Sequence, residues 1–122
     1  MKDINERTSM TLTVSFFDED KIPVTPDAAS YRIDDLTSKS PILGSTSIGT
    51  LATSVLLQIT RGQNSILDST RSIEIHAVTV EFDYGVGKHG TAEYRFSVIN
   101  LYGVSTVASP SLSPSEIGRA HV

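Results

Sequence analysis

The sequence predicts an all-β protein, built as a single antiparallel β-sandwich of about seven strands. Several short segments alternate apolar and polar residues with a period of two, which is the pattern of strands buried on one face. Clusters of Gly, Pro, Asp and Ser separate these segments at short intervals, and no segment sustains the period of a helix. The 122 residues are enough for one domain with a single core.

Three strands in the first half of the chain are predicted from this alternation. Residues 11–16, residues 29–34 and residues 54–59 each place apolar side chains on one face. Residues 38–50 are rich in Ser, Gly and Thr, and we expect an edge region there with only the short segment PIL as a strand. The inward residues of the three strands are Leu12, Val14, Phe16, Ala29, Tyr31, Ile33, Val55, Leu57 and Ile59.

The alternation stops after the third strand. Residues 60–70 predict one helical turn capped by Thr60, with Ile66 and Leu67 directed toward the core. This turn is expected to connect the two sheets.

The next segment, residues 73–84, changes parity part-way along. Ile73, Ile75 and Ala77 share one face, whereas the apolar residues after them fall on the other face, which predicts a β-bulge or bend near Ala77. The loop GVGKHG then leads into a partner strand, so that the two segments predict a hairpin. In the partner strand Tyr94, Phe96 and Val98 are expected to face inward, and Glu93, Arg95 and Ser97 outward.

These segments together predict a sandwich of the immunoglobulin-like or fibronectin-like type in the broad architectural sense. The chain has no Cys and no Trp, so the disulfide and the core tryptophan of antibody domains are absent. We expect a polar N-terminal arm over residues 1–9, the sandwich over residues 10–104 and a Ser/Pro-rich tail over residues 105–122.

The composition of the chain argues against several classes of function. The net charge of −4 and the lack of a clustered basic stripe argue against a nucleic-acid partner. The N-terminal residues lack the apolar region of a secretory signal, and no apolar run is long enough for a membrane helix. Without cysteine, a thiolate zinc site and a cysteine nucleophile are excluded.

The glycine-rich loop is the first candidate site. Gly85, Gly87 and Gly90 match the spacing of loops that bind a dinucleotide pyrophosphate. Such a loop must open a helix whose N-terminus faces the anion, whereas here a strand follows. We therefore interpret these glycines as a hairpin loop that needs positive φ angles, and predict no cofactor.

Acidic and histidine residues are the second group of candidates. Asp18–Asp20 with Asp34 and Asp35 are carboxylates of the kind that Ca²⁺ binds, but without a recognised loop spacing we interpret them as solvated turn residues. The histidines have no zinc-binding spacing and are predicted to lie on the surface; they are His76, His89 and His121. No nucleophile elbow is present. The sequence therefore predicts no catalytic, cofactor-binding or metal-binding residues, and no enzyme.

Two long segments carry a resemblance to a known group of proteins. VSFFDEDKIPVTPDAASYRIDD and VTVEFDYGVGKHGTAEYRFSVINLYGV resemble small proteins encoded among the structural genes of tailed bacteriophages, and the likeness covers Met10 to Val104. Lys21 departs from it, because the relatives often carry Gly there, and this implies a different turn. The resemblance implies a virion component, assembled in the host cytoplasm within a symmetric particle.

The functions that follow from this resemblance are expectations. A capsid-bound accessory or decoration protein comes first, with the major capsid protein or connector proteins as partners and neither nucleic acid nor membrane. A neck or head-to-tail connector is the close alternative. An adhesin-like receptor- or carbohydrate-binding module would use exposed loop aromatics, for which Tyr102 is the candidate.

The last seven residues, EIGRAHV from Glu116 to Val122, have no structural pattern. Back-translated as GAG ATC GGA AGA GCA CAC GTC, they match read-through into a short-read sequencing adapter. We expect them to be artefactual, from an assembled environmental read set, so that Arg119 and His121 carry no functional weight and the true C-terminus is not defined.

Overall fold

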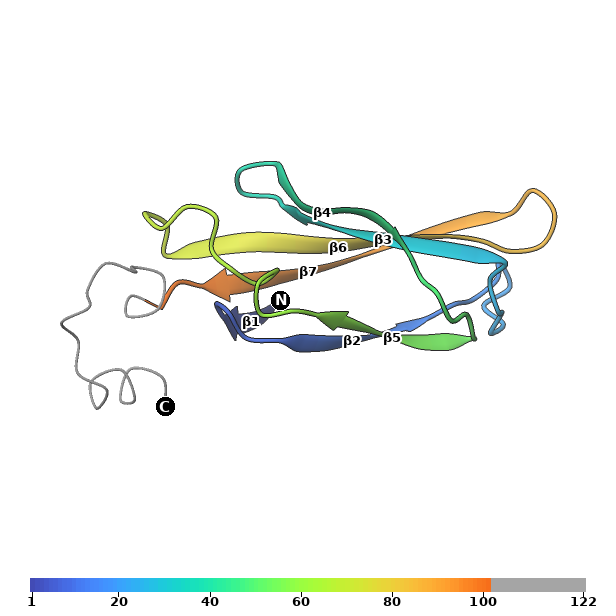
Figure 1. The fold of residues 1–122 in the computed structure, drawn as a ribbon. Coiled ribbons are helices and arrows are strands. Elements are labelled where there is room, and N and C mark those ends of the chain that lie inside the picture. Colours follow the sequence, from blue (N-terminus) through green and yellow to red (C-terminus); the bar gives the residue numbers. More distant parts are fainter. Residues whose placement is uncertain (102–122) are drawn as a thin grey trace.

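The computed structural model describes residues 1–101, whose strands form two facing sheets (Figure 1). The described residues hold no helix, and therefore none that could cross a membrane. The strands are β1 (Lys2–Asn5), β2 (Met10–Ser15), β3 (Ala28–Asp35), β4 (Ser40–Ser47), β5 (Ser54–Ile59), β6 (Ile73–Asp83) and β7 (His89–Ile99). The all-β class and the expected number of strands are thus confirmed.

The two sheets differ in size. One has five strands in the order β1-β7-β6-β3-β4, and the other has only β2 and β5, which lie beneath the longer strands in Figure 1. Every neighbouring pair is antiparallel except β1 and β7, which are parallel. The sandwich is therefore mostly, not entirely, antiparallel.

The polar N-terminal residues 1–9, expected as an arm, contribute the strand β1. It runs parallel to the C-terminal part of β7, with Lys2 opposite Phe96 and Asn5 opposite Ile99. Ile4 is buried, whereas the other residues of β1 are exposed. A single apolar side chain is too weak a pattern to mark a strand in a sequence, but here it anchors the edge of the larger sheet.

Side chains from both sheets fill the core between them. Ile33 of β3 and Phe96 and Val98 of β7 come from the larger sheet, and they pack with Ile59 of β5 and with Phe16, which directly follows β2. Each such side chain contributes about 1.5–3 kcal/mol relative to an exposed position. The predicted inward faces of residues 11–16, 29–34 and 54–59 are confirmed.

The Ser/Gly/Thr-rich segment lies at an edge of the larger sheet, as predicted. β4 is the outermost strand of the larger sheet, but it extends well beyond the short segment PIL. Its pairing with β3 is irregular, with register shifts between Tyr31 and Ile33 and between Ile33 and Asp34. Pro41 opposite Asp34 is tolerated because the edge of a sheet leaves one side of the strand without a ladder.

The predicted bulge near Ala77 is wrong. β6 pairs with β7 without interruption from Ile73 to Asp83, and its pairing with β3 is equally regular. Glu74 and His76, both fully buried, continue the inward face of Val78, whereas Ile73 at the start of the strand is 46% exposed. The apolar residues of the sequence change from one face of the strand to the other because the polar residues Glu74 and His76 occupy inward positions at its start.

The segment between β5 and β6 matches its prediction in part. The Thr60 hydroxyl accepts a hydrogen bond from the Gln63 amide, and the Asn64 amide binds the Thr60 carbonyl, which makes a single capped turn. Ile66 packs against the core as expected. Leu67 does not, because its side chain is 48% exposed while its amide binds the carboxylate of Glu74.

Candidate functional site

A buried polar cluster lies at one end of the larger sheet. It consists of Asp35, the last residue of β3, and Glu74 and His76 in the first half of β6, and it is called the polar cluster below. The neighbouring strands bring the three together, because Asp35 lies opposite His76 in the antiparallel register. All three side chains are fully buried, and one ligand atom from each lies within 4.8 Å of the others.

Charged partners surround each member of the polar cluster. The His76 Nε2 atom lies 3.2 Å from Glu74 Oε1 and 3.9 Å from Asp35 Oδ1. Arg71 reaches in from the preceding loop, and its Nη1 atom lies 3.4 Å from Asp35 Oδ2 and 3.5 Å from Glu74 Oε2. The Arg71 side chain is 30% exposed, so its guanidinium closes the cluster toward solvent.

The two carboxylates also hold loops in place. Asp35 accepts hydrogen bonds from the amides of Thr37 and Ser38 and from the Ser38 hydroxyl, at 3.1, 3.2 and 2.6 Å. Glu74 accepts them from the amides of Leu67 and Asp68, at 2.8 and 2.9 Å. The polar cluster therefore joins the β3–β4 turn, the loop before β6 and β6 itself.

The hydrogen bonds that the polar cluster already makes decide whether it can bind a divalent metal. One imidazole and two carboxylates are ligands that a divalent metal accepts, but each of the four carboxylate oxygens already accepts a hydrogen bond from the protein. Arg71 supplies the compensating positive charge at the place where a cation would act. Burying a carboxylate costs several kcal/mol unless it is paired and hydrogen-bonded, and these contacts meet that requirement.

Two sequence predictions are corrected here. His76 was expected on the surface and Asp35 in a solvated turn, yet both are fully buried. The sequence does contain a signal for the burial of Asp35, because Asp35 falls on the same face of its strand as Ala29, Tyr31 and Ile33. Glu74 was not singled out, although it and His76 share the parity of Val78. Glu74 is held by two amides and by Arg71, all within seven residues of it, and alternation alone does not show that these groups turn toward it.

Of the other candidate carboxylates, Asp18 lies in a turn, as interpreted from the sequence, and Asp34 lies in β3 with its side chain 22% exposed. Asp18 Oδ1 accepts hydrogen bonds from the amides of Asp20 and Ile22. Asp34 forms a 2.8 Å ion pair with Arg32, and this hydrogen bond and charge raise the pKa of Arg32. The Asp18–Asp20 segment lies near the opposite end of β3 from Asp34 and Asp35 (Figure 1), so the two acidic groups do not form one Ca²⁺ site.

The glycine-rich loop joins β6 to β7 as a hairpin, as predicted. Gly85 and Gly87 have φ angles of 61° and 70°, which the hairpin requires. Gly90 is different, because it lies in β7 directly opposite Phe82. His89 is a surface residue, as expected, with its Nδ1 atom 2.7 Å from Asp83 Oδ1 and its side chain 51% exposed.

The Lys88 side chain of this loop pairs with Glu19. Their hydrogen bond, followed by the charge of Glu19, raises the pKa of Lys88. Both side chains are about half exposed, so this contact connects two loops without enclosing a site. His121, Tyr102 and the segment from Glu116 onward lie outside the described residues.

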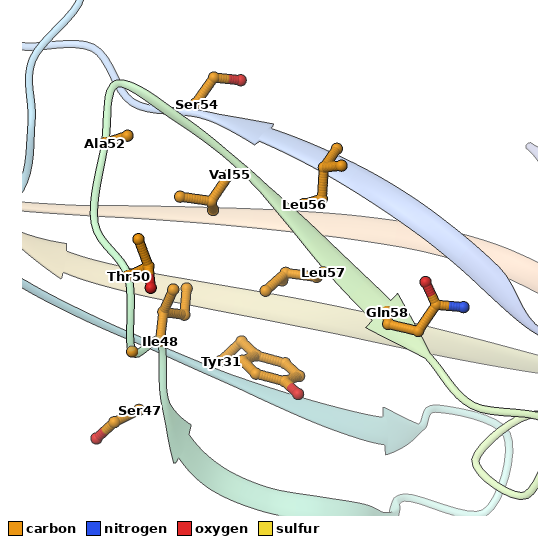
Figure 2. A pocket seen from close by; sticks show the side chains of 11 residues that line it. Tyr31, Ser47, Ile48, Thr50, Ala52, Ser54, Val55, Leu56, Leu57 and Gln58 are labelled. Atoms are coloured by element: carbon orange, nitrogen blue, oxygen red, sulfur yellow. The ribbon is translucent and has the colours of Figure 1, made fainter.

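An open groove of about 640 Å³ runs along the free edge of β5 (Figure 2). Tyr31 and Ile48 lie on one side of it, and Val55 and Leu57 of β5 face them. None of its eleven lining residues is charged. A smaller groove of about 220 Å³ lies beside β2, between Leu12 and Tyr94.

Comparisons of this chain with protein-family models, with curated proteins and with solved structures found no match. No family is therefore assigned.

Proposed function

We propose that this chain is a non-enzymatic structural component of a tailed-phage particle, bound to the capsid as an accessory or decoration protein. The observation that carries the proposal is the contrast between interior and surface. Asp35, Glu74 and His76 are enclosed, and every oxygen of the two carboxylates accepts a hydrogen bond from the protein, whereas the buried Nδ1 atom of His76 has no hydrogen-bond partner among the described residues. The surface offers strand edges and uncharged grooves, which are features of a contact protein.

The strand arrangement supports an immunoglobulin-like sandwich, the finer part of this proposal. In that architecture the second and fifth canonical strands share one sheet, and the third, sixth and seventh share the other. Here β2 and β5 form one sheet, whereas β3, β6 and β7 are neighbours in the other. β1 and β4 depart from the constant-type arrangement, which places the first and fourth strands with the second and fifth; here they extend the other sheet at its two edges.

A decoration role follows from the size and surface of such a module. A small sandwich repeated over a symmetric shell makes many weak contacts at once, and their combined avidity exceeds that of any single contact. Free strand edges add the option of pairing with a strand of a neighbouring protein. The resemblance of residues 10–104 to small virion proteins is in line with this role.

A neck or head-to-tail connector would use the same surfaces, so copy number separates the two roles. We would measure the ratio of this protein to the major capsid protein in purified particles by quantitative mass spectrometry, with the portal protein as an internal standard. A count in the hundreds is expected for decoration. About six to twelve copies would move the protein to the neck or tail, and its absence from particles would overturn the virion proposal.

One observation favours a second class, an adhesin-like carbohydrate-binding module. The β5 groove is lined by the half-buried ring of Tyr31, by Thr50 and by Gln58, and sugars bind to such combinations of aromatic and uncharged polar groups. A glycan-array screen tests this class. Specific binding that is lost in Tyr31→Ala would support it over the decoration role.

A further inference from the structure

We propose that two copies of this chain pair through the free edges of their β5 strands. The pairing is antiparallel about a two-fold axis at Leu56, so that β2 and β5 of both copies form one four-stranded sheet. This inference is independent of the virion proposal, because it concerns only the contact between copies of the chain.

The free edge of β5 lacks the features that normally prevent pairing. Among residues 1–101, β5 pairs only with β2, in an unbroken register from Ser54 to Ile59. Natural proteins protect exposed edges with charges, prolines, bulges or a cover. The β5 sequence SVLLQI contains neither a charged residue nor a proline, and its pairing shows no bulge.

The edges of the larger sheet carry such protection, and the β2 edge of the small sheet lacks an exposed apolar side chain. β1 has Lys2 and Asp3, and β4 has Pro41 and an irregular register. The part of β7 that extends past β1 carries the ion pair of Glu93 and Arg95. β2 has only Thr and Ser on its outward face, and so presents no apolar side chain to a partner.

Leu56 supplies the apolar contact on β5. It lies in the middle of the strand, its side chain is 69% exposed, and Figure 2 shows it on the side away from Val55 and Leu57. A single exposed leucine is common on protein surfaces, and Leu56 matters here because it lies in the middle of an unprotected strand edge. Pairing with a second copy would cover it.

The sequence around Leu56 is self-complementary in polarity. Val55 and Leu57 on either side are apolar, and Ser54 and Gln58 beyond them are uncharged and polar. An antiparallel two-fold pairing places Leu56 opposite Leu56 of the other copy, with Ser54 opposite Gln58 on the same face. A two-fold interface requires a patch that complements itself, and this property favours a second copy over an unrelated strand.

The absence of charge extends over a continuous segment of the chain around β5. Residues 40–60 contain no charged side chain, in a chain whose net charge is −4. They include the edge strands β4 and β5 and most of the lining of the β5 groove. Two acidic copies can therefore approach here without burying like charges, whereas repulsion opposes approach through acidic surfaces.

The first test is the oligomeric state of the full chain. Sedimentation velocity over a range of concentrations is expected to show a monomer–dimer equilibrium, and Leu56→Lys is expected to weaken it at least about tenfold. Thr13→Lys is the matched control, because Thr13 lies opposite Leu56 on the neighbouring strand but away from the free edge. Circular dichroism confirms that both variants fold. A wild type that stays monomeric up to about millimolar concentration, or a dimer unaffected by Leu56→Lys, overturns the proposal.

The second test fixes the register. The chain has no cysteine, so Leu56→Cys introduces a single thiol. Directly opposed residues of antiparallel strands have Cα atoms about 4.5–5.5 Å apart, within the range of a disulfide. Mild oxidation is expected to cross-link Leu56→Cys into a dimer, and Thr13→Cys to remain monomeric. Equal cross-linking of both variants, or of neither, contradicts pairing at Leu56.

Discussion

Gly90 shows how one residue adjusts the packing of the sandwich. An added Cβ at this position would lie 2.4 Å from Cζ of Phe82, whose ring covers the glycine from the neighbouring strand. The same ring makes an edge contact with Phe16, at 5.0 Å between centroids, and stacks on Tyr84 at 5.7 Å. Gly90 therefore supports the aromatic packing by leaving room for Phe82.

Gly90→Ala is expected to lower the free energy of unfolding by about 1–3 kcal/mol, because the Phe82 ring must leave its contacts. Urea denaturation followed by circular dichroism measures the change. Gly44→Ala is the control, since Gly44 has no atom within 4 Å of an added Cβ, and its stability should change by less than about 0.5 kcal/mol. Equal effects of the two substitutions would contradict this account.

At the scale of secondary-structure elements, the polar cluster joins two strands and a loop. Asp35 ends β3, Glu74 and His76 begin β6, and Arg71 belongs to the loop between β5 and β6. The contact of Asp35 with Arg71 joins residues 36 apart in the sequence, whereas the contacts of Glu74 with Arg71 and His76 are local. The cluster therefore fixes the end of the larger sheet in the way that a patch of apolar side chains fixes its centre.

Asp35→Ala is expected to destabilise the protein by about 3–5 kcal/mol, because it removes one partner of a buried charge network and leaves loop amides without an acceptor. Asp34→Ala is the control on the adjacent residue. Asp34 pairs with Arg32 on the surface, and such a pair contributes about 0–1 kcal/mol. Chemical denaturation of both variants checks the difference, and a small effect of Asp35→Ala would show that the cluster does not hold the sheet.

On the scale of the whole molecule, the larger sheet holds most of the stabilising interactions, and the small sheet holds the proposed contact surface. The larger sheet contains the polar cluster and most of the buried apolar side chains, whereas the small sheet covers it incompletely and leaves grooves along both of its edges. The proposed pairing through β5 uses the less protected sheet, so interface variants such as Leu56→Lys should leave the fold intact.

Divalent cations are not expected to stabilise the protein. Zn²⁺ or Ca²⁺ would have to displace Arg71 and the hydrogen bonds to Asp35 and Glu74. Thermal unfolding in the presence of about 100 μM metal should therefore match unfolding with a chelator. A metal bound to the folded state with a Kd of about 1 μM would instead add about 2.7 kcal/mol of stability, and a raised melting temperature that is lost in His76→Ala would identify the polar cluster as a metal site.

The sequence by itself determined the all-β class and the inward faces of β2, β3 and β5, because alternation of apolar residues is a local property that the pleat of a strand translates directly into burial. It also determined the hairpin glycines Gly85 and Gly87, whose φ angles are a local requirement. Only the tertiary structure decided the strand at Lys2–Asn5, the continuous course of β6 and the burial of Asp35, Glu74 and His76. The strand β1 and the pairing of Asp35 with His76 and Arg71 depend on partners far away in the chain. The two carboxylates also bind amides two to seven residues away, but alternation alone does not show that these amides turn toward a buried carboxylate.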